Sequence, residues 1–115
     1  MNLTPRVVRI YNADRPDGID DLDLGLRKTF DPAPQPAVLD PLPLVRTVQD
    51  DVALELIEYG RADNLPAALT GKFYIVPLEV ALVLHPRRVD LLVTHDAVTT
   101  SDGTVIGYRA LAQPV

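Results

Sequence analysis

The chain contains no cysteine among its 115 residues, and it has only two histidines. Without cysteine it forms no disulfide, no zinc–thiolate site and no cysteine nucleophile. Two histidines alone are too few for a typical transition-metal site. The sequence therefore predicts no metal and no cofactor, and it leaves the cellular compartment open. The expected location is the cytoplasm or a virion.

Long apolar runs are also missing. A membrane-spanning helix needs about 18–20 consecutive apolar residues. The best candidate, in the trailing half of the chain, is interrupted by Lys72, Pro77, Glu79 and Pro86. The first six residues lack the apolar centre of a secretory signal peptide. We therefore expect neither a membrane protein nor a secreted one.

Positive charge is scarce and unevenly placed. The chain has 11 basic and 16 acidic residues, a net charge of −5. Residues 1–60 hold 6 basic and 11 acidic groups (6 − 11 = −5), whereas residues 61–115 hold 5 of each (5 − 5 = 0). A nucleic-acid-binding domain would be expected to show a basic patch with aromatic residues beside it. No such patch is evident, so nucleic acid is not an expected partner.

The strongest structural signals lie in residues 72–113, which we predict to be a β-rich core. Phe73–Val76 and Arg88–Val93 are rich in β-branched and aliphatic residues and predict strands. Residues 95–99 and 104–111 predict a hairpin, with Ser101-Asp102-Gly103 as its turn. Residues 77–85 fit a buried helix of two turns or a strand that continues past Pro77, and the helix is preferred.

The leading 30 residues predict two strands separated by an acidic loop. Arg6–Tyr11 alternates in the manner of a strand, and the Pro-Asp-Gly triplet ending at Gly18 predicts a turn. Apolar and polar residues then alternate from Leu22 towards Phe30, which predicts a half-buried strand. Gly25 indicates a bulge or irregular pairing in that strand.

Residues 31–44 carry five prolines and predict an extended segment. A purely solvated linker would not need the apolar residues of this segment, which are Val38, Leu39, Leu42 and Leu44. Two interpretations stay open. The segment is either a connection that runs over the surface of its own domain, or an arm that packs on a neighbouring subunit or another partner. These four residues are accordingly candidate interaction residues.

Residues 45–71 predict a helical segment. Thr47 to Asp50 resembles a capping box, and the apolar residues that follow to Tyr59 include a set at helical spacing, with Gly60 placed to end the helix. Alternating Val52, Leu54 and Leu56 favour a strand instead, and this is the competing interpretation. Residues 64–71 predict a second, shorter helix that begins at an asparagine cap.

The predicted fold is a single α+β domain over residues 1–115. It combines a small, mostly antiparallel or mixed sheet of about four to six strands with one or two short helices. Its expected segments are N-terminal strands with an acidic loop (1–30), the proline-rich segment (31–44), the helical segment (45–71) and the β-rich core (72–113).

No constellation in the sequence predicts chemistry. The acidic cluster from Asp14 to Asp23 lacks the ligand spacing of an EF-hand, so a solvated loop is the preferred interpretation; Asp20, Asp21 and Asp23 are kept as candidate interaction residues. His95 and Asp96 are adjacent, and on a strand they would point to opposite faces rather than bond each other. Glycines are too dispersed for a phosphate-binding loop.

These observations favour a non-catalytic interaction or structural module that associates with itself or joins a larger assembly, such as a virion-like particle. The link to particles is an analogy with other small domains that carry extended arms. Two alternatives remain. One is an acidic regulator that binds a basic partner surface, and the other is a small ligand-binding or enzyme subunit that uses His95, Asp96 or the acidic loop.

Overall fold

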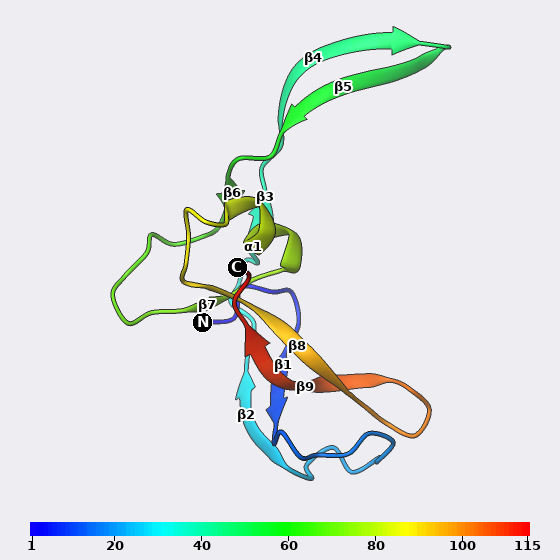
Figure 1. Ribbon diagram of the computed structural model, residues 1–115, viewed down its shortest axis with the longest axis vertical. Coiled ribbons are helices and arrows are strands. Elements are labelled where there is room, and N and C mark those ends of the chain that lie inside the picture. The colour runs from blue at the N-terminus through cyan, green and yellow to red at the C-terminus, as the bar shows by residue number, and fades with distance from the viewer.

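The computed structural model describes residues 1–115 and is built almost entirely of strands, with 43% of residues in strands and 6% in one helix. The predicted α+β class is therefore wrong, and the fold is essentially all-β (Figure 1). The error arises in residues 45–71, where the expected helices are absent and strands occupy about half of the length.

The body of the molecule contains a mixed sheet with the strand order β2-β1-β9-β8-β7. Strands β1 and β2 are antiparallel, as are β8 and β9, whereas β1 runs parallel to β9 and β7 runs parallel to β8. The strands are β1 (Val8–Tyr11), β2 (Leu26–Phe30), β7 (Tyr74–Ile75), β8 (Leu91–Thr99) and β9 (Val105–Ala112). The predicted hairpin with its turn at residues 101–103 is confirmed as β8 and β9.

The helix preferred for residues 77–85 is also confirmed, as α1 (Leu78–Leu84), which connects the parallel strands β7 and β8. Proline precedes its first turn, where a missing amide donor costs nothing. Val80, Ala81 and Leu84 form its buried face, at the spacing expected of a helix that packs on a sheet. Their main partners are buried residues of the strands and loops, which are Leu3, Ala37, Tyr74, Val76, Leu91 and Val93.

Close packing also explains one glycine of the sheet. A Cβ atom at Gly107 in β9 would lie 2.6 Å from the carbonyl oxygen of Arg9 and 2.6 Å from the ring of Tyr11. No side chain fits in this gap, so β1 approaches β9 directly over the glycine. The single residue pair that joins these strands, Ile10 with Tyr108, is next to it.

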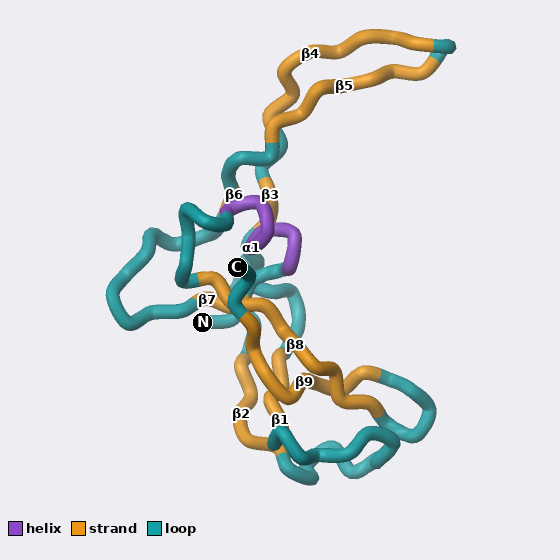
Figure 2. The backbone as a smooth tube through the Cα atoms, in the orientation of Figure 1, coloured by secondary structure: helices purple, strands orange, loops and turns teal.

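A long hairpin of β4 (Leu42–Gln49) and β5 (Val52–Glu58) extends away from the body (Figures 1 and 2). Its base is the short antiparallel pair β3 (Val38–Leu39) and β6 (Ala62–Asp63). The projection gives the chain a radius of gyration of 17.6 Å. A compact chain of this length would have about 13 Å.

The hairpin replaces the helix predicted over residues 47–59. Asp50 and Asp51 both have positive φ, 52° and 63°, between the paired residues Gln49 and Val52. Two residues of positive φ form a type I′ turn, whose twist matches that of the flanking strands. The second predicted helix, over residues 64–71, is also wrong, because this stretch is irregular.

Strand β4 contains Pro43, although a proline lacks the amide donor that a central strand needs. Pro43 is tolerated because both strands of a two-stranded hairpin are edge strands. The register shifts between Pro43 and Val45, which leaves Leu44 as a bulge. The strand predicted from Leu22 begins only at Leu26, because the preceding residues form turns and Gly25 has a positive φ of 73°.

The one helix has seven residues, too few to cross a membrane.

Candidate functional site

The β4–β5 hairpin, here called the arm, is the largest feature of the molecule that its own chain does not cover. Every residue from Pro41 to Tyr59 is exposed. Eight of these are large aliphatic residues of the two strands: Leu42, Leu44, Val45, Val48, Val52, Leu54, Leu56 and Ile57. Apolar surface concentrated in this way marks a site of interaction with another molecule.

The register of the arm sorts its side chains onto two different faces. Val45 pairs with Leu56, Thr47 pairs with Leu54, and Val52 lies on the same side two residues from Leu54. We call these five residues the apolar face. The apolar face has no charged residue along its middle, where Leu54 and Leu56 are 45% and 65% exposed.

The opposite face of the arm is mixed. Arg46 pairs with Glu55 across the strands, with 3.6 Å between guanidinium and carboxylate, and Val48 pairs with Ala53. An exposed ion pair of this kind adds little stability, but it keeps this face hydrated. The arm is therefore amphipathic, and the apolar face is the side suited to a protein surface.

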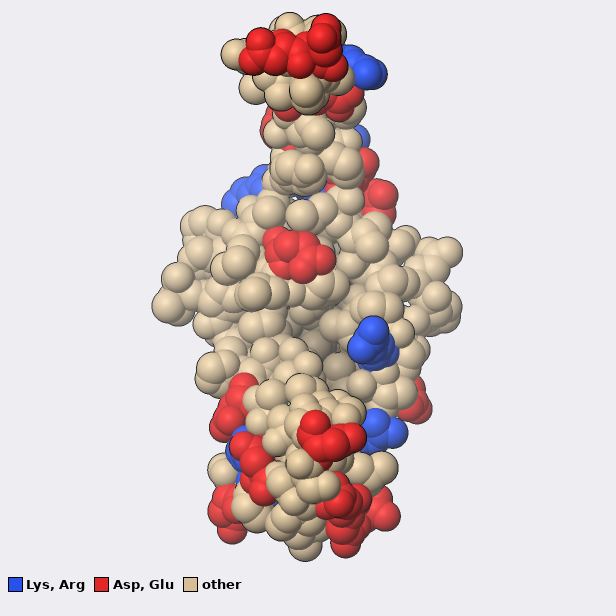
Figure 3. Space-filling view, turned by 90° about the vertical axis from the view of Figure 1, so that its right-hand side faces the viewer, with Lys and Arg blue, Asp and Glu red and all other residues tan.

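The free end of the arm is acidic. Residues 42–58 hold one basic and four acidic groups, a net charge of 1 − 4 = −3, and Asp50 and Asp51 form the turn. Acidic atoms are prominent at this end in the space-filling view (Figure 3). A surface complementary to the arm would therefore combine apolar side chains with positive charge.

The two chain segments that join arm and body are tied together, and we call this region the neck. Arg61 forms an ion pair with Asp40 at 2.8 Å, and its carbonyl oxygen accepts a hydrogen bond from the Asp40 amide at 2.9 Å. Arg87, just beyond α1, donates to the carbonyl oxygen of Gly60 at 2.7 Å. These contacts hold the base of the arm against the body.

The four apolar residues predicted for interaction separate into two groups. Leu42 and Leu44 lie at the base of the arm and are exposed. Val38 and Leu39 belong to β3, where Leu39 packs against the core and Val38 remains 46% exposed. The predicted proline-rich segment ended at residue 44, so it did not include the apolar face, which begins at Val45. The alternation of Val52, Leu54 and Leu56 was the sequence signal for this face.

The three aspartates predicted for interaction lie in the loop between β1 and β2, which contains a buried cation, Arg15. Arg15 is 3% exposed, and its guanidinium stacks over Tyr11 with 4.7 Å to the ring centroid and donates to backbone carbonyls. Asp21 contributes its carbonyl oxygen at 2.7 Å and caps Asp23 with its carboxylate. The loop is thus organised internally around Arg15, a role that its position as the one basic residue among five aspartates did not reveal.

The carboxylates of Asp17 and Asp20 attach this loop to the β8–β9 hairpin. Asp20 accepts hydrogen bonds from the amide and hydroxyl of Ser101, and these lower the pKa of Asp20. Arg109 donates to Asp17 at 2.8 Å, which holds the pKa of Asp17 below its ordinary value. Both shifts stabilise the charged carboxylate, so these groups are suited to structural contacts rather than to proton transfer near neutral pH.

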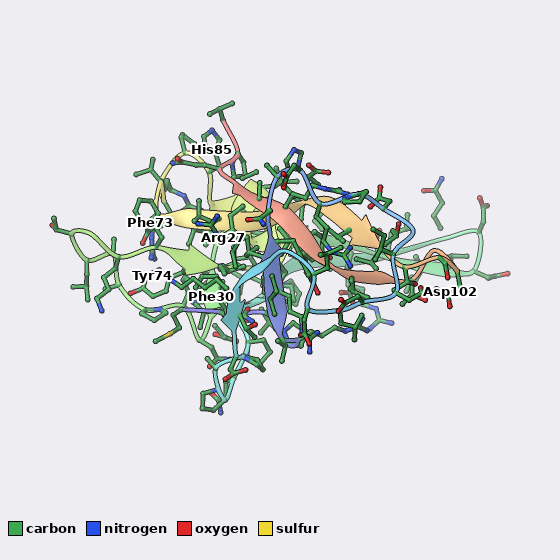
Figure 4. The ribbon with its side chains drawn as sticks, turned by 90° about the horizontal axis from the view of Figure 1, so that it is seen from below. Arg27, Phe30, Phe73, Tyr74, His85 and Asp102 are labelled. Carbon is green, nitrogen blue, oxygen red and sulfur yellow. The ribbon has the colours of Figure 1, made fainter.

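The two histidines and Asp96 do not come together in a common site. His95 is exposed on β8, and Asp96 pairs with Arg109 at 3.0 Å instead of with the histidine. Figure 4 places His85, after α1, far from Asp102 in the β8–β9 turn. None of the five main surface grooves is lined by a histidine or by an aspartate of the β1–β2 loop. No group of three or more potential metal ligands is present.

Arg88 and Asp90, two residues apart just before β8, form a tight ion pair. Two hydrogen bonds of 2.9 Å join the guanidinium to both carboxylate oxygens, and the side chains are only 20% and 11% exposed. Arg88 also donates to the carbonyl oxygen of Pro66 at 2.9 Å. This pair fastens the irregular stretch after β6 to the start of β8.

Comparisons with protein-family models, with curated proteins and with solved structures found no match to this chain.

Proposed function

We propose that this protein is a non-catalytic module that joins proteins into an assembly, with the arm as its docking element. The observation that carries the proposal is the uninterrupted exposure of residues 41–59 together with the aliphatic residues that they contain. An apolar side chain gains about 1.5–3 kcal/mol when it moves from water into a packed interior. The apolar face offers four such side chains besides Thr47, and a flat partner surface would bury them together.

The architecture of the arm supports the same function. An isolated two-stranded hairpin is marginally stable in water. Both outer edges of the arm also lack a pairing strand, and an uncovered edge readily recruits another chain. A hairpin with these properties is stabilised by docking, because the partner covers the side chains that its own body leaves exposed.

The alternative functions have less support. An acidic regulator would need its carboxylates free to meet a basic partner, but Asp17 and Asp20 bond within the chain. An enzyme or ligand-binding subunit would bring His95 or Asp96 into a groove with a perturbed pKa. His95 and Asp96 instead lie apart from the main grooves, and the lowered pKa values of Asp17 and Asp20 run against a role as general base.

The test compares the full chain with a chain without the arm, in extracts of the native source. In the arm-less chain residues 44–56 are replaced by Asn-Gly, which joins the paired residues Pro43 and Ile57 through a two-residue turn. Sedimentation should show the full chain in complexes well above its own mass of 12.6 kDa. The arm-less chain should sediment as a single chain.

A matched pair of variants tests whether loss of binding is specific to the apolar face or follows from any substitution on the arm. Leu54→Ser with Leu56→Ser should release the protein from its complexes, whereas Val48→Ser with Ala53→Ser, on the opposite face, should leave most of it bound. If the arm-less chain enters the same complexes as the full chain, the arm is not the docking element and the proposal fails.

A further inference from the structure

A groove of about 530 Å³ lies on the body between residues 4–9 and the beginning of β9. Its apolar lining includes Val7 and Val105, which are 39% and 50% exposed, with Ile106 and Tyr108 half-buried beside them. A volume of this size is typical of a pocket that encloses a small ligand or a few side chains. The groove is therefore large enough to receive the tip of a hairpin.

The groove is also basic. Arg6 and Arg9 contribute to its lining, and neither forms an ion pair or a side-chain hydrogen bond within the chain. By contrast, Arg15, Arg88 and Arg109 are all engaged internally. The groove thus combines apolar side chains with two available positive charges.

The tip of the arm has the complementary composition. Asp50 and Asp51 provide two negative charges, and Val52 beside them, a residue of the apolar face, is 57% exposed. Opposite charges on facing surfaces guide association and determine which partner fits. We infer that the arm of one copy of this chain docks on a second copy, with its tip in the groove between residues 4–9 and β9.

Charge also disfavours the alternative arrangement, in which the arms of two copies pack against each other. If two arms packed with their apolar faces together, two segments of net charge −3 would lie side by side. Like charges in such proximity are destabilising. The body groove provides the positive charge that a second arm lacks, so it is the favoured receptor.

The two contact surfaces lie on different parts of the chain. The arm extends from one end of the molecule, whereas β1 and β9 lie in the opposite half (Figures 1 and 2). A contact between different surfaces of identical copies is heterologous: it generates a ring if the rotation closes, and an open chain if it does not. Each copy then supplies one arm and one groove. This inference builds on the proposed function and identifies the partner.

The experiment uses the purified chain and chromatography with light scattering. The measured mass of the full chain should exceed that of a monomer. The groove variant, Arg6→Glu with Arg9→Glu, should have the mass of a monomer. A control with the same change in charge outside the groove, Arg27→Glu with Lys28→Glu on β2, should assemble as the full chain does. Adding Asp50→Lys and Asp51→Lys to the groove variant should restore assembly, because both charges are then reversed.

A mixture of two defective chains gives the most specific result. The arm-less chain keeps its groove, and the groove variant keeps its arm. Neither should assemble alone, but together they should form a complex of one copy of each and nothing larger. Circular dichroism of each variant establishes that the body is folded.

The outcomes separate this inference from the proposed function. A full chain that stays a single chain at all concentrations overturns self-docking, and the arm then serves a different protein in the native extract. A groove variant that assembles normally, or a mixture that forms no complex, overturns the groove as receptor. An arm-less chain that assembles normally in both the purified and the native experiments overturns both.

Discussion

The body and the arm both contain many aliphatic residues, but the body buries them and the arm exposes them to solvent. Val80 and Val98 in the body are 0% exposed, whereas Val48 and Val52 in the arm are 71% and 57% exposed. In the body, a helix covers one part of the sheet and the chain completes its own core. The arm has regular strands and an ordered turn but no core. In the body the chain covers its own aliphatic residues, whereas in the arm it leaves them exposed, which is why we propose that another surface completes the arm.

The first prediction compares equivalent leucines in the two regions. Leu91→Ala should lower the free energy of unfolding by about 2–5 kcal/mol, because Leu91 is 1% exposed and its truncation leaves a cavity. Leu54→Ala in the arm should change the free energy of unfolding by no more than about 0.5 kcal/mol. Urea denaturation at low protein concentration measures both. Equal losses would show that the arm is part of the same cooperative unit.

A second prediction concerns the close contact inside the body. Gly107→Ala should destabilise the body by about 1–3 kcal/mol, because the added methyl group would meet the backbone of β1 at 2.6 Å. Gly103→Ala, in the β8–β9 turn, provides a control with open space around the new methyl group, although its φ of 85° adds some local strain. If the thermal unfolding of Gly107→Ala matches that of the parent chain, the strands are not as close as described.

A third prediction uses the pH dependence of stability to test the Arg88–Asp90 ion pair of the body. The hydrogen bonds from Arg88 lower the pKa of Asp90 below its ordinary value of 3.8. As pH falls, the unfolded state therefore takes up the proton first, and the stabilisation by Asp90 is present above about pH 4 and lost as pH falls through the folded-state pKa. Asp90→Asn should cost about 1 kcal/mol at neutral pH, the difference between a charge-assisted and a neutral hydrogen bond.

The measurement is urea denaturation of both chains from neutral pH downwards. The difference in stability between parent and Asp90→Asn should shrink once pH passes below 3.8. Asp102, whose pKa is lowered to about 2 by hydrogen bonds from Thr100 and Thr104, keeps its charge further into acid. A difference that stays constant with pH would mean that the charge of Asp90 does not account for the loss.

The smallest expected effect lies in the arm itself. Asp51 has a φ of 63°, a conformation that glycine adopts at lower cost. Asp51→Gly should slow hydrogen exchange of the arm amides by an amount equivalent to about 0.4–1 kcal/mol of local stability, without changing global unfolding. The chain with the groove substitutions keeps the arm undocked for this measurement. Ala53→Gly, within a strand, should have the opposite effect, and identical behaviour of the two would contradict the assigned turn.

The body was largely predictable from the sequence because its signals are local and agree with burial. The alternation in β1 and the turn at residues 101–103 each specify one structure. The apolar residues at these positions are covered by the chain itself, as pattern analysis assumes. What the sequence left open between residues 77 and 85 was decided by the parallel pairing of β7 with β8, which needs a crossover.

The arm was mispredicted because its aliphatic residues are not buried by this chain. Val48, Val52 and Leu56 recur every four residues, which is the pattern of an amphipathic helix that packs on a core. The same residues also suit two strands joined at Asp50 and Asp51, and Asp-Asp is a weaker turn signal than Asn-Gly. Which pattern prevails depends on tertiary structure. The proline-rich segment gave the better indication of the arm, because an extended arm was one of the two interpretations of its apolar residues.

The neck has a consequence for the geometry of any assembly that the arm builds. The Asp40–Arg61 ion pair and the bond from Arg87 to Gly60 set the angle at which the arm leaves the body. If that angle is the same in every copy, consecutive copies are related by a constant rotation, and the curvature of the assembly follows from it. Substitution of Arg61 or Arg87 would then make the angle between arm and body vary from copy to copy, while the docking surfaces stay intact. Assemblies of irregular size, rather than dissociated chains, would be the sign of a loosened joint.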